Sequence, residues 1–227
     1  MTGVYYFSAT GHSEAVARYF AAALDAPMYP IGEGCPPEVT TAVIVFPVYC
    51  QNVPLPVKVF LPGLKAENVV LIATYGRMGY GNVLWEAAQS ISGQVIAAAY
   101  VPTGHSYLKE GVPVDYGPLQ PIWDRIADPQ PVTVPNLRKW WLADLFPNIR
   151  GRLSVKLQRN GKCTQCGLCD EQCPMGTMKN GIPGKDCIRC LRCVTRCPES
   201  ALRFSCGPVL RWYLRKPRQT ETVLYLE

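Results

Sequence analysis

Short runs of apolar residues alternate with amphipathic stretches along the first hundred residues of the chain. The runs cover 4–7, 42–46, 69–73 and 95–99. Each run is too short for a helix and too continuously apolar for a strand with one wet face, so we expect four buried strands. Strands that alternate with helical stretches are typical of a parallel sheet covered on both faces, which predicts an α/β fold here.

Two of the stretches between these runs carry apolar residues at helical spacing. The first stripe consists of Val16, Tyr19, Phe20, Ala23 and Leu24, and the second of Val83, Leu84, Ala87, Ala88 and Ile91. A short strand near 28–31 and a helix around 56–61 complete the series. The pattern therefore predicts a doubly wound sheet of five parallel strands joined by crossover helices.

Beyond residue 101 the composition shifts to proline and glycine, which indicates a long loop or lid over 102–118 before a helix at 119–127. A second stretch bounded by prolines, 129–135, precedes an aromatic segment with Trp140 and Trp141. We place a domain junction at 128–155. We interpret the tryptophan pair as packing that docks two domains, with a substrate platform as the alternative.

Eight of the eleven cysteines lie between Cys163 and Cys197. The first residues, 1–7, lack a basic leader, and no apolar run approaches the roughly 18 residues that a membrane span needs. We therefore expect an unprocessed cytoplasmic chain without a membrane span. In that compartment, crowded cysteines favour metal ligation over disulfides.

The eight cysteines spell C-x-x-C-x-x-C-x-x-x-C-P twice, as an internal repeat. The first copy contains Cys163, Cys166, Cys169 and Cys173, and the second contains Cys187, Cys190, Cys193 and Cys197. Three thiolates at this spacing supply one wall of a cubane [4Fe–4S] cluster, and the fourth must come from elsewhere. Two structural zinc sites are the competing interpretation, but zinc ribbons separate two C-x-x-C pairs by a long spacer and need no third cysteine.

This part, about 156–204, resembles the bacterial two-cluster ferredoxins. The resemblance implies that each copy donates its fourth cysteine to the other cluster. Cluster I would then be held by Cys163, Cys166, Cys169 and Cys197, and cluster II by Cys187, Cys190, Cys193 and Cys173. The three remaining cysteines, Cys35, Cys50 and Cys206, are expected to be buried or partly buried thiols that act as small apolar side chains.

Directly after the first predicted strand, the chain reads Ser8-Ala9-Thr10-Gly11-His12-Ser13. We expect a helix to begin here with Ser13 as its N-cap, so that hydroxyls and free N–H groups form a socket for a dianionic phosphate. The string matches neither G-x-G-x-x-G nor the P-loop. It resembles the phosphate loop of the flavodoxin family, which implies the strand order 2-1-3-4-5 and an FMN whose phosphate is bound by Ser8, Thr10, Gly11, His12 and Ser13.

Two further loops follow strands whose carboxyl ends should face the same crevice. We expect both loops to border the flavin ring, with Tyr49, Tyr75 and Tyr80 as candidates to stack on it and with glycines that let backbone amides approach. The cofactor-binding residues predicted in these loops are Pro47, Val48, Tyr49, Thr74, Tyr75, Gly76, Gly79, Tyr80 and Gly81.

Charge is uneven along the chain. Residues 1–150 carry nine basic and eleven acidic side chains, whereas 151–227 carry fourteen and six. Two thiolate-ligated clusters would offset much of this basic excess, and no aromatic-basic reading motif accompanies it, so we expect no nucleic-acid binding. Free flavodoxins are usually strongly acidic, and the near-neutral first part implies a covalently attached redox partner.

The whole chain resembles the flavodoxin–ferredoxin fusion proteins of anaerobic bacteria and archaea, the EFR1-type ferredoxins. The resemblance implies an FMN-binding flavodoxin-like domain at 1–127, a linker and docking segment at 128–155, a small α+β two-[4Fe–4S] ferredoxin-like domain at 156–206 and a tail at 207–227. The predicted function is electron transfer between the clusters and FMN, with a redox protein or a small molecule as the external partner. A homodimer is compatible with these features.

Two other function classes compete with the carrier. One is an FMN-dependent reductase of a small molecule, with the 102–118 loop as its lid and His105 or Tyr107 above the ring. The other is a redox sensor or structural module, for which we find no partner helix. An enclosed cavity above the flavin would favour the reductase.

Overall fold

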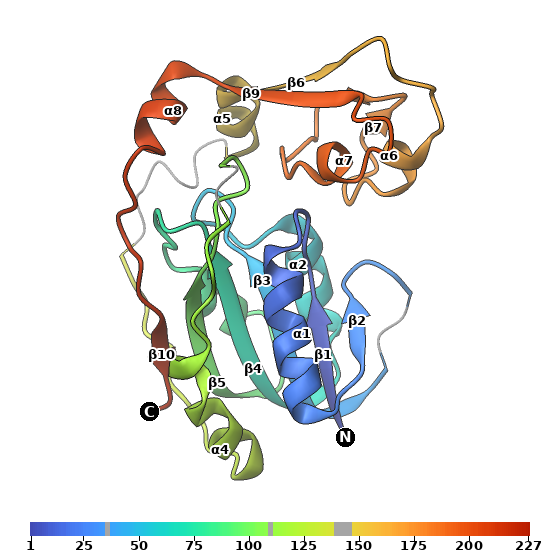
Figure 1. Ribbon diagram of the computed structural model, residues 1–227. Coiled ribbons are helices and arrows are strands. Elements are labelled where there is room, and N and C mark those ends of the chain that lie inside the picture. The colour runs from blue at the N-terminus through green and yellow to red at the C-terminus, as the bar shows by residue number, and fades with distance from the viewer. Residues whose placement is uncertain (35–36, 109–110, 139–146) are drawn as a thin grey trace. The chain divides into compact units, whose positions relative to one another are not determined.

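The computed structural model describes residues 1–34, 37–108, 111–138 and 147–227 (Figure 1). The chain forms two compact units. The first contains Met1–Trp140 together with Arg218–Glu227, and the second contains Trp141–Pro217. The last ten residues therefore return to the first unit, and the cysteine-rich unit is joined to it by two connections. The predicted docking pair, Trp140 and Trp141, lies outside the described residues.

A six-stranded sheet lies at the centre of the first unit, in the order β10-β5-β4-β3-β1-β2 (Figure 1). Its strands are β1 (Thr2–Tyr6), β2 (Met28–Pro30), β3 (Val39–Pro47), β4 (Ala66–Tyr75), β5 (Gln94–Pro102) and β10 (Val223–Tyr225). The first five pair in parallel, in the order 2-1-3-4-5. This order confirms the predicted flavodoxin-like doubly wound sheet.

Helices cover both faces of this sheet. They are α1 (His12–Leu24), α2 (Leu55–Phe60), α3 (Val83–Ala88) and α4 (Pro121–Ala127), with short 3₁₀ turns at Leu61–Gly63 and Gly117–Leu119. Alternate residues of β3 belong to different cores: Val43 and Val45 pack with α1 and α4, whereas Ile44 and Phe46 pack with α2 and α3. Burial on both sides explains the continuous apolar runs of the sequence.

The sixth strand, β10, extends the sheet beyond the predicted five strands. It pairs antiparallel with β5, with Val223 opposite Tyr100 and Tyr225 opposite Ala98. The guanidinium of Arg125, on α4, donates a hydrogen bond to the carbonyl oxygen of Leu226. The end of the chain is thus fixed to both the sheet and a helix of the first unit.

The second unit is small and built from short elements. Strands β6 (Val155–Arg159) and β9 (Leu202–Cys206) pair antiparallel, as do β7 (Met178–Lys179) and β8 (Ile182–Pro183). Its helices are α5 (Pro147–Ser154), α6 (Leu168–Glu171), α7 (Arg192–Thr195) and α8 (Pro208–Tyr213). This is the small α+β architecture expected for the cysteine-rich part. Among the helices of the described residues, none combines the length and apolar character needed to cross a membrane.

Candidate functional site

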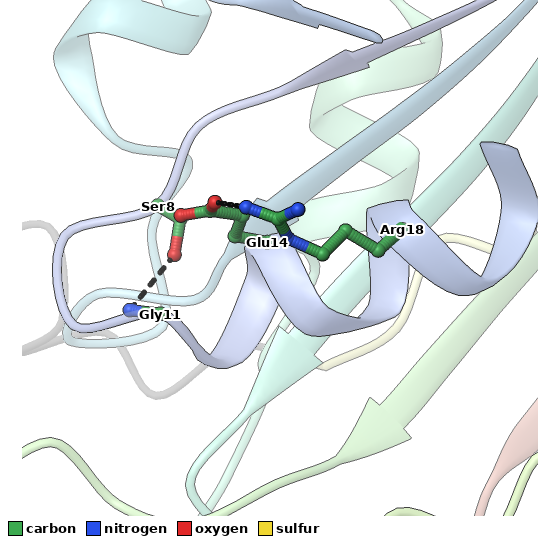
Figure 2. Close-up of polar contacts among 4 residues, drawn as sticks. All are labelled: Ser8, Gly11, Glu14 and Arg18. Carbon is green, nitrogen blue, oxygen red and sulfur yellow. Dashed lines mark hydrogen bonds and ion pairs between the residues drawn. The ribbon is translucent and has the colours of Figure 1, made fainter.

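The loop after β1 turns sharply into helix α1. Gly11 adopts φ 92°, in the left-handed region, and stands immediately before the helix without a side-chain cap. Its N–H donates a hydrogen bond to Ser8 Oγ over 3.2 Å (Figure 2). The prediction of Ser13 as N-cap is wrong, because the turn at Gly11 starts the helix at His12 and leaves Ser13 within its first turn.

The serine and threonine side chains of this loop connect it to two other strand ends. Ser13 is buried, and its Oγ lies 2.7 Å from Oγ1 of Thr74, at the end of β4. Thr10 Oγ1 lies 3.1 Å from Oγ of Ser106, in the loop after β5. The structure thus brings the 8–13 loop to the ends of β4 and β5, which is where a doubly wound sheet binds its ligand.

An acidic residue stands in the first turn of α1. Glu14 forms an ion pair with Arg18 one turn later, with 2.5 Å between Oε1 and the guanidinium nitrogen (Figure 2). Both partners are at the surface, and such an i,i+4 pair is worth only about 0.3–0.5 kcal/mol. It nevertheless places a positive charge beside the carboxylate, which reduces its repulsion of an anion at the helix N-terminus.

Two histidines approach each other beside this loop. His105, after β5, packs so closely on Gly76 that a Cβ atom there would lie 2.5 Å from its Cδ2. The backbone N–H of Tyr107 donates to His105 Nδ1 over 3.2 Å. Burial and the neighbouring His12 lower the pKa of His105 to about 4, and burial also lowers the pKa of His12. Both imidazoles are therefore neutral at pH 7.

The low pKa of His105 predicts an acid-sensitive first unit. In the unfolded chain, His105 is protonated as the pH falls below 6.5, whereas in the folded protein it stays neutral down to about pH 4. The free energy of unfolding therefore has its full value above pH 6.5 and falls as the pH decreases below it. For the protein without any added ligand, we expect the free energy of unfolding to fall by about 2 kcal/mol between pH 8 and pH 5. Urea unfolding of His105→Asn, which keeps an acceptor for Tyr107, should show a smaller loss; an equal loss in both proteins would contradict the assignment.

The loop after β3 is a tight turn. Tyr49 and Asn52 exchange backbone hydrogen bonds of 3.1 and 2.9 Å, while Cys50 and Gln51 between them have positive φ. The N–H of Val48 donates to Thr74 O over 2.8 Å, which joins this loop, entered through Pro47, to β4. Cys50 is exposed, so its expected burial is wrong: the residue stands at the tip of a turn.

The tyrosines predicted to stack on a flavin occupy different environments. Tyr75 is only 2% exposed, and its hydroxyl donates to Glu221 O over 2.6 Å, so its ring has no open face. Tyr80 stacks on Tyr100, with ring centroids 3.8 Å apart, and stays partly exposed. Tyr49 also stays partly exposed and contacts Phe7 edge to face.

The two cysteine repeats fold alike. Each enters a four-residue helix, α6 or α7, through a residue with positive φ, Gly167 in the first repeat and Leu191 in the second. Other positions 24 residues apart share this backbone conformation, Gln165 with Arg189 and Gly176 with Ser200. The repeat of the sequence is thus a repeat of backbone geometry, which presents both cysteine sets in the same way.

Two cavities lie between these repeats. The first, of about 450 Å³ including its open part, is lined by Cys163, Cys166, Cys169, Cys193 and Cys197. The second, of about 310 Å³, is lined by Cys173, Cys187, Cys190 and Cys193. Each cavity therefore combines the first three cysteines of one repeat with the last cysteine of the other, and Cys193 lines both cavities. The described cysteines, Cys206 included, form no disulfide; Cys35 lies outside the described residues.

Burial is uneven among these eight cysteines: Cys187 is buried, Cys166 is exposed, and the other six are partly buried. Burial, with neighbouring cysteines, raises the pKa of Cys190 to about 11 and that of Cys193 to about 12. The N–H of Ala201 donates to Cys197 Sγ over 3.3 Å. Among the described residues, no group of three or more His, Cys, Asp or Glu side chains is placed to hold a single metal ion. The thiols instead surround the two cavities.

Comparison with known proteins gives limited matches. No family model matches this chain. The uncharacterized protein MJ0750 of Methanocaldococcus jannaschii is 39% identical over 51 residues, 22% of this chain and 21% of that protein. MJ0749 of the same organism is 42% identical over 52 residues, with the same coverage. The matched segment thus spans about a fifth of the length of these curated relatives.

Two solved structures resemble part of the chain. Both are described as a "putative flavoprotein", one from Bacteroides uniformis and one from Bacteroides eggerthii. Each is 20% identical to this chain. The match to the first covers 46% of this chain and 91% of the solved structure, with a TM-score of 0.35. The match to the second covers 56% of this chain and 97% of the solved structure, with a TM-score of 0.38. The fold of the first unit is established by its own strand order, and its function has to be argued from its own residues.

Proposed function

We propose that this chain is an electron-transfer iron–sulfur flavoprotein that binds FMN in its first unit and two [4Fe–4S] clusters in its second. One observation carries the proposal: each of the two cavities is lined by the three closely spaced cysteines of one repeat and the last cysteine of the other. This is the ligand arrangement of two-cluster ferredoxins. Zinc ribbons do not use a third cysteine at the same interval.

The cysteine unit fits a cluster in each cavity. Cys163, Cys166, Cys169 and Cys197 would ligate the first cluster, and Cys187, Cys190, Cys193 and Cys173 the second. The raised pKa of the buried thiols means that iron must displace their protons on binding. The hydrogen bond from the N–H of Ala201 to Cys197 Sγ favours the thiolate form and is a means of tuning the reduction potential.

The loop after β1 fits a phosphate group. Helix α1 directs its N-terminal N–H groups at the loop, and Ser8, Thr10 and Ser13 add hydroxyls. Apart from Gly11 and its two neighbours in the chain, no heavy atom of the described residues lies within 4 Å of the position that a Cβ would take at Gly11, so the backbone is open to a ligand there. Together with the neutral His12, these residues would bind the phosphate of FMN.

The loops after β3 and β4 would border the isoalloxazine ring. Pro47, Val48 and Tyr49 would lie on one side, and the backbone of Thr74 and Tyr75, Gly76, Gly79, Tyr80 and Gly81 on the other. When bound, FMN accepts one or two electrons whereas each cluster passes one, so the pairing converts between two-electron and one-electron chemistry. The chain's own residues bind and orient the cofactors and keep water from the buried sulfurs.

A reductase acting on a small molecule is the second candidate, and one observation favours it. His105, after β5, is held against Gly76 of the flavin-bordering loop, and its neutral ring accepts the Tyr107 N–H at Nδ1. Because Nδ1 accepts this hydrogen bond, the proton of the neutral ring is on Nε2, and a reductase would use it to protonate its substrate. Under either function, the electron donor would be a redox protein or a small molecule.

Cofactor analysis of anaerobically purified protein tests the proposal. We expect about eight irons, eight sulfides and one FMN per chain, and the electron paramagnetic resonance signals of two interacting clusters after reduction with dithionite. In stopped-flow mixing with a one-electron donor, cluster bleaching and flavin reduction should be kinetically linked. Zinc-loaded protein without iron, or independent reduction of the two kinds of cofactor, would contradict the proposal.

A further inference from the structure

The segment after the cysteine unit crosses the flavin-bordering loop of the first unit. The N–H groups of Arg218 and Gln219 donate to Arg77 O over 2.9 and 3.3 Å. Further along this segment, the carbonyl oxygen of Glu221 accepts a hydrogen bond from the hydroxyl of Tyr75 over 2.6 Å. The loop that begins at the end of β4 is therefore bound along its length by a segment from the far end of the chain.

This segment has a fixed position because strand β10 anchors it. Strand β10 pairs with β5 (Figure 1). The ring of Tyr225 contacts the Tyr100 ring edge to face, with centroids 6.4 Å apart. Tyr100 in turn stacks on Tyr80 of the flavin-bordering loop. Gln219, four residues before β10, is thus held beside this loop by contacts on both of its sides.

Two side-chain amides from distant parts of the chain lie near Gly79. A Cβ atom at this position would lie 3.2 Å from Nε2 of Gln51 and 4.0 Å from Oε1 of Gln219. Oε1 of Gln219 is buried and has no hydrogen-bond partner within the described part of the protein. Buried acceptors are nearly always satisfied, and one that is not calls for a ligand or a water molecule. A donor and an acceptor from distant parts of the chain are therefore presented together at the loop.

We propose that Gln219 and Gln51 bind the imide edge of the isoalloxazine ring, which makes the C-terminal segment part of the flavin site; this inference rests on the proposed function. The imide edge places a carbonyl next to the N3–H group, an acceptor beside a donor. Nε2 of Gln51 and Oε1 of Gln219 form the complementary pair.

A chemical double-mutant cycle tests the contact to N3–H. FMN and 3-methyl-FMN, which lacks that proton, are titrated into the flavin-free full-length protein and followed by flavin fluorescence. We expect Gln219→Met to weaken FMN about fivefold to tenfold, the usual effect of one hydrogen bond. Methylation of N3 should weaken binding to the wild type by more than it weakens binding to Gln219→Met.

Control variants separate this inference from the proposed function. Thr220→Ala changes the neighbouring exposed residue and should bind both flavins as the wild type does. Gln51→Met, the second half of the pair, should weaken FMN to a similar extent as Gln219→Met. An equal penalty for N3 methylation in the wild type and in Gln219→Met overturns the inference, whereas a wild type that binds no FMN overturns the proposed function itself.

Discussion

The double variant Cys163→Ala/Cys197→Ala is expected to retain about four irons per chain, whereas Cys187→Ala/Cys197→Ala is expected to retain almost none. The first pair lines one cavity, so removing both thiols destroys a single cluster. The second pair belongs to different cavities, and each change removes a ligand from a different cluster. Iron and sulfide quantitation after anaerobic purification measures both variants.

The two variants exchange their outcomes if each repeat binds its own cluster. Cys163 and Cys197 belong to different repeats, whereas Cys187 and Cys197 belong to the same one. In that case the first variant would lose both clusters and the second would keep one. Cys206→Ala, at a partly buried cysteine that lines neither of these cavities, should keep about eight irons and is the matched control.

Thr10→Asp is expected to weaken FMN binding by at least about a hundredfold while leaving riboflavin affinity within about threefold. Two unit charges 4 Å apart interact by about 4 kcal/mol near a protein surface, and a hundredfold change requires about 2.7 kcal/mol. The introduced carboxylate would lie in the loop proposed to bind a dianionic phosphate. Riboflavin has no phosphate and would not be repelled.

Thr10→Val provides the control for this charge effect. It removes the hydroxyl that contacts Ser106 without adding a charge, so we expect a loss of about tenfold or less for FMN. Fluorescence titration of FMN and riboflavin into the flavin-free form of each variant gives four affinities, one for each combination of variant and flavin. A Thr10→Asp protein that loses riboflavin and FMN equally would show that the loop does not bind the phosphate.

Burial explains which elements the sequence could predict. Strands β3 and β4 are covered on both faces, and this leaves a continuous apolar run that reads directly as a buried strand. The second apolar stripe continued to Ile91, but α3 ends at Ala88. Ile91 still packs against the core, so its apolar character reflects burial and not helix formation.

Features set by distant contacts escaped the sequence pattern. Strand β10 has three residues, too few for a period, and forms only because the chain returns to β5. The sequence around Tyr75 does not indicate its hydrogen bond to Glu221, and the sequence around Gln219 does not indicate that its side chain lies near Gly79. The cysteine spacing and the hydroxyl-rich loop after β1 could be read without the structure because each is a local motif with its own chemistry.

The return of the chain to the first unit makes the cysteine-rich unit an insertion and not an appendage. Ending the chain before residue 141 would remove β10 and bare the edge of β5, and uncovered edges recruit strands from other molecules. Excising 141–217 and splicing the ends would keep all six strands. An evolutionary gain or loss of the cysteine-rich unit is therefore expected to require two coordinated breakpoints in the gene.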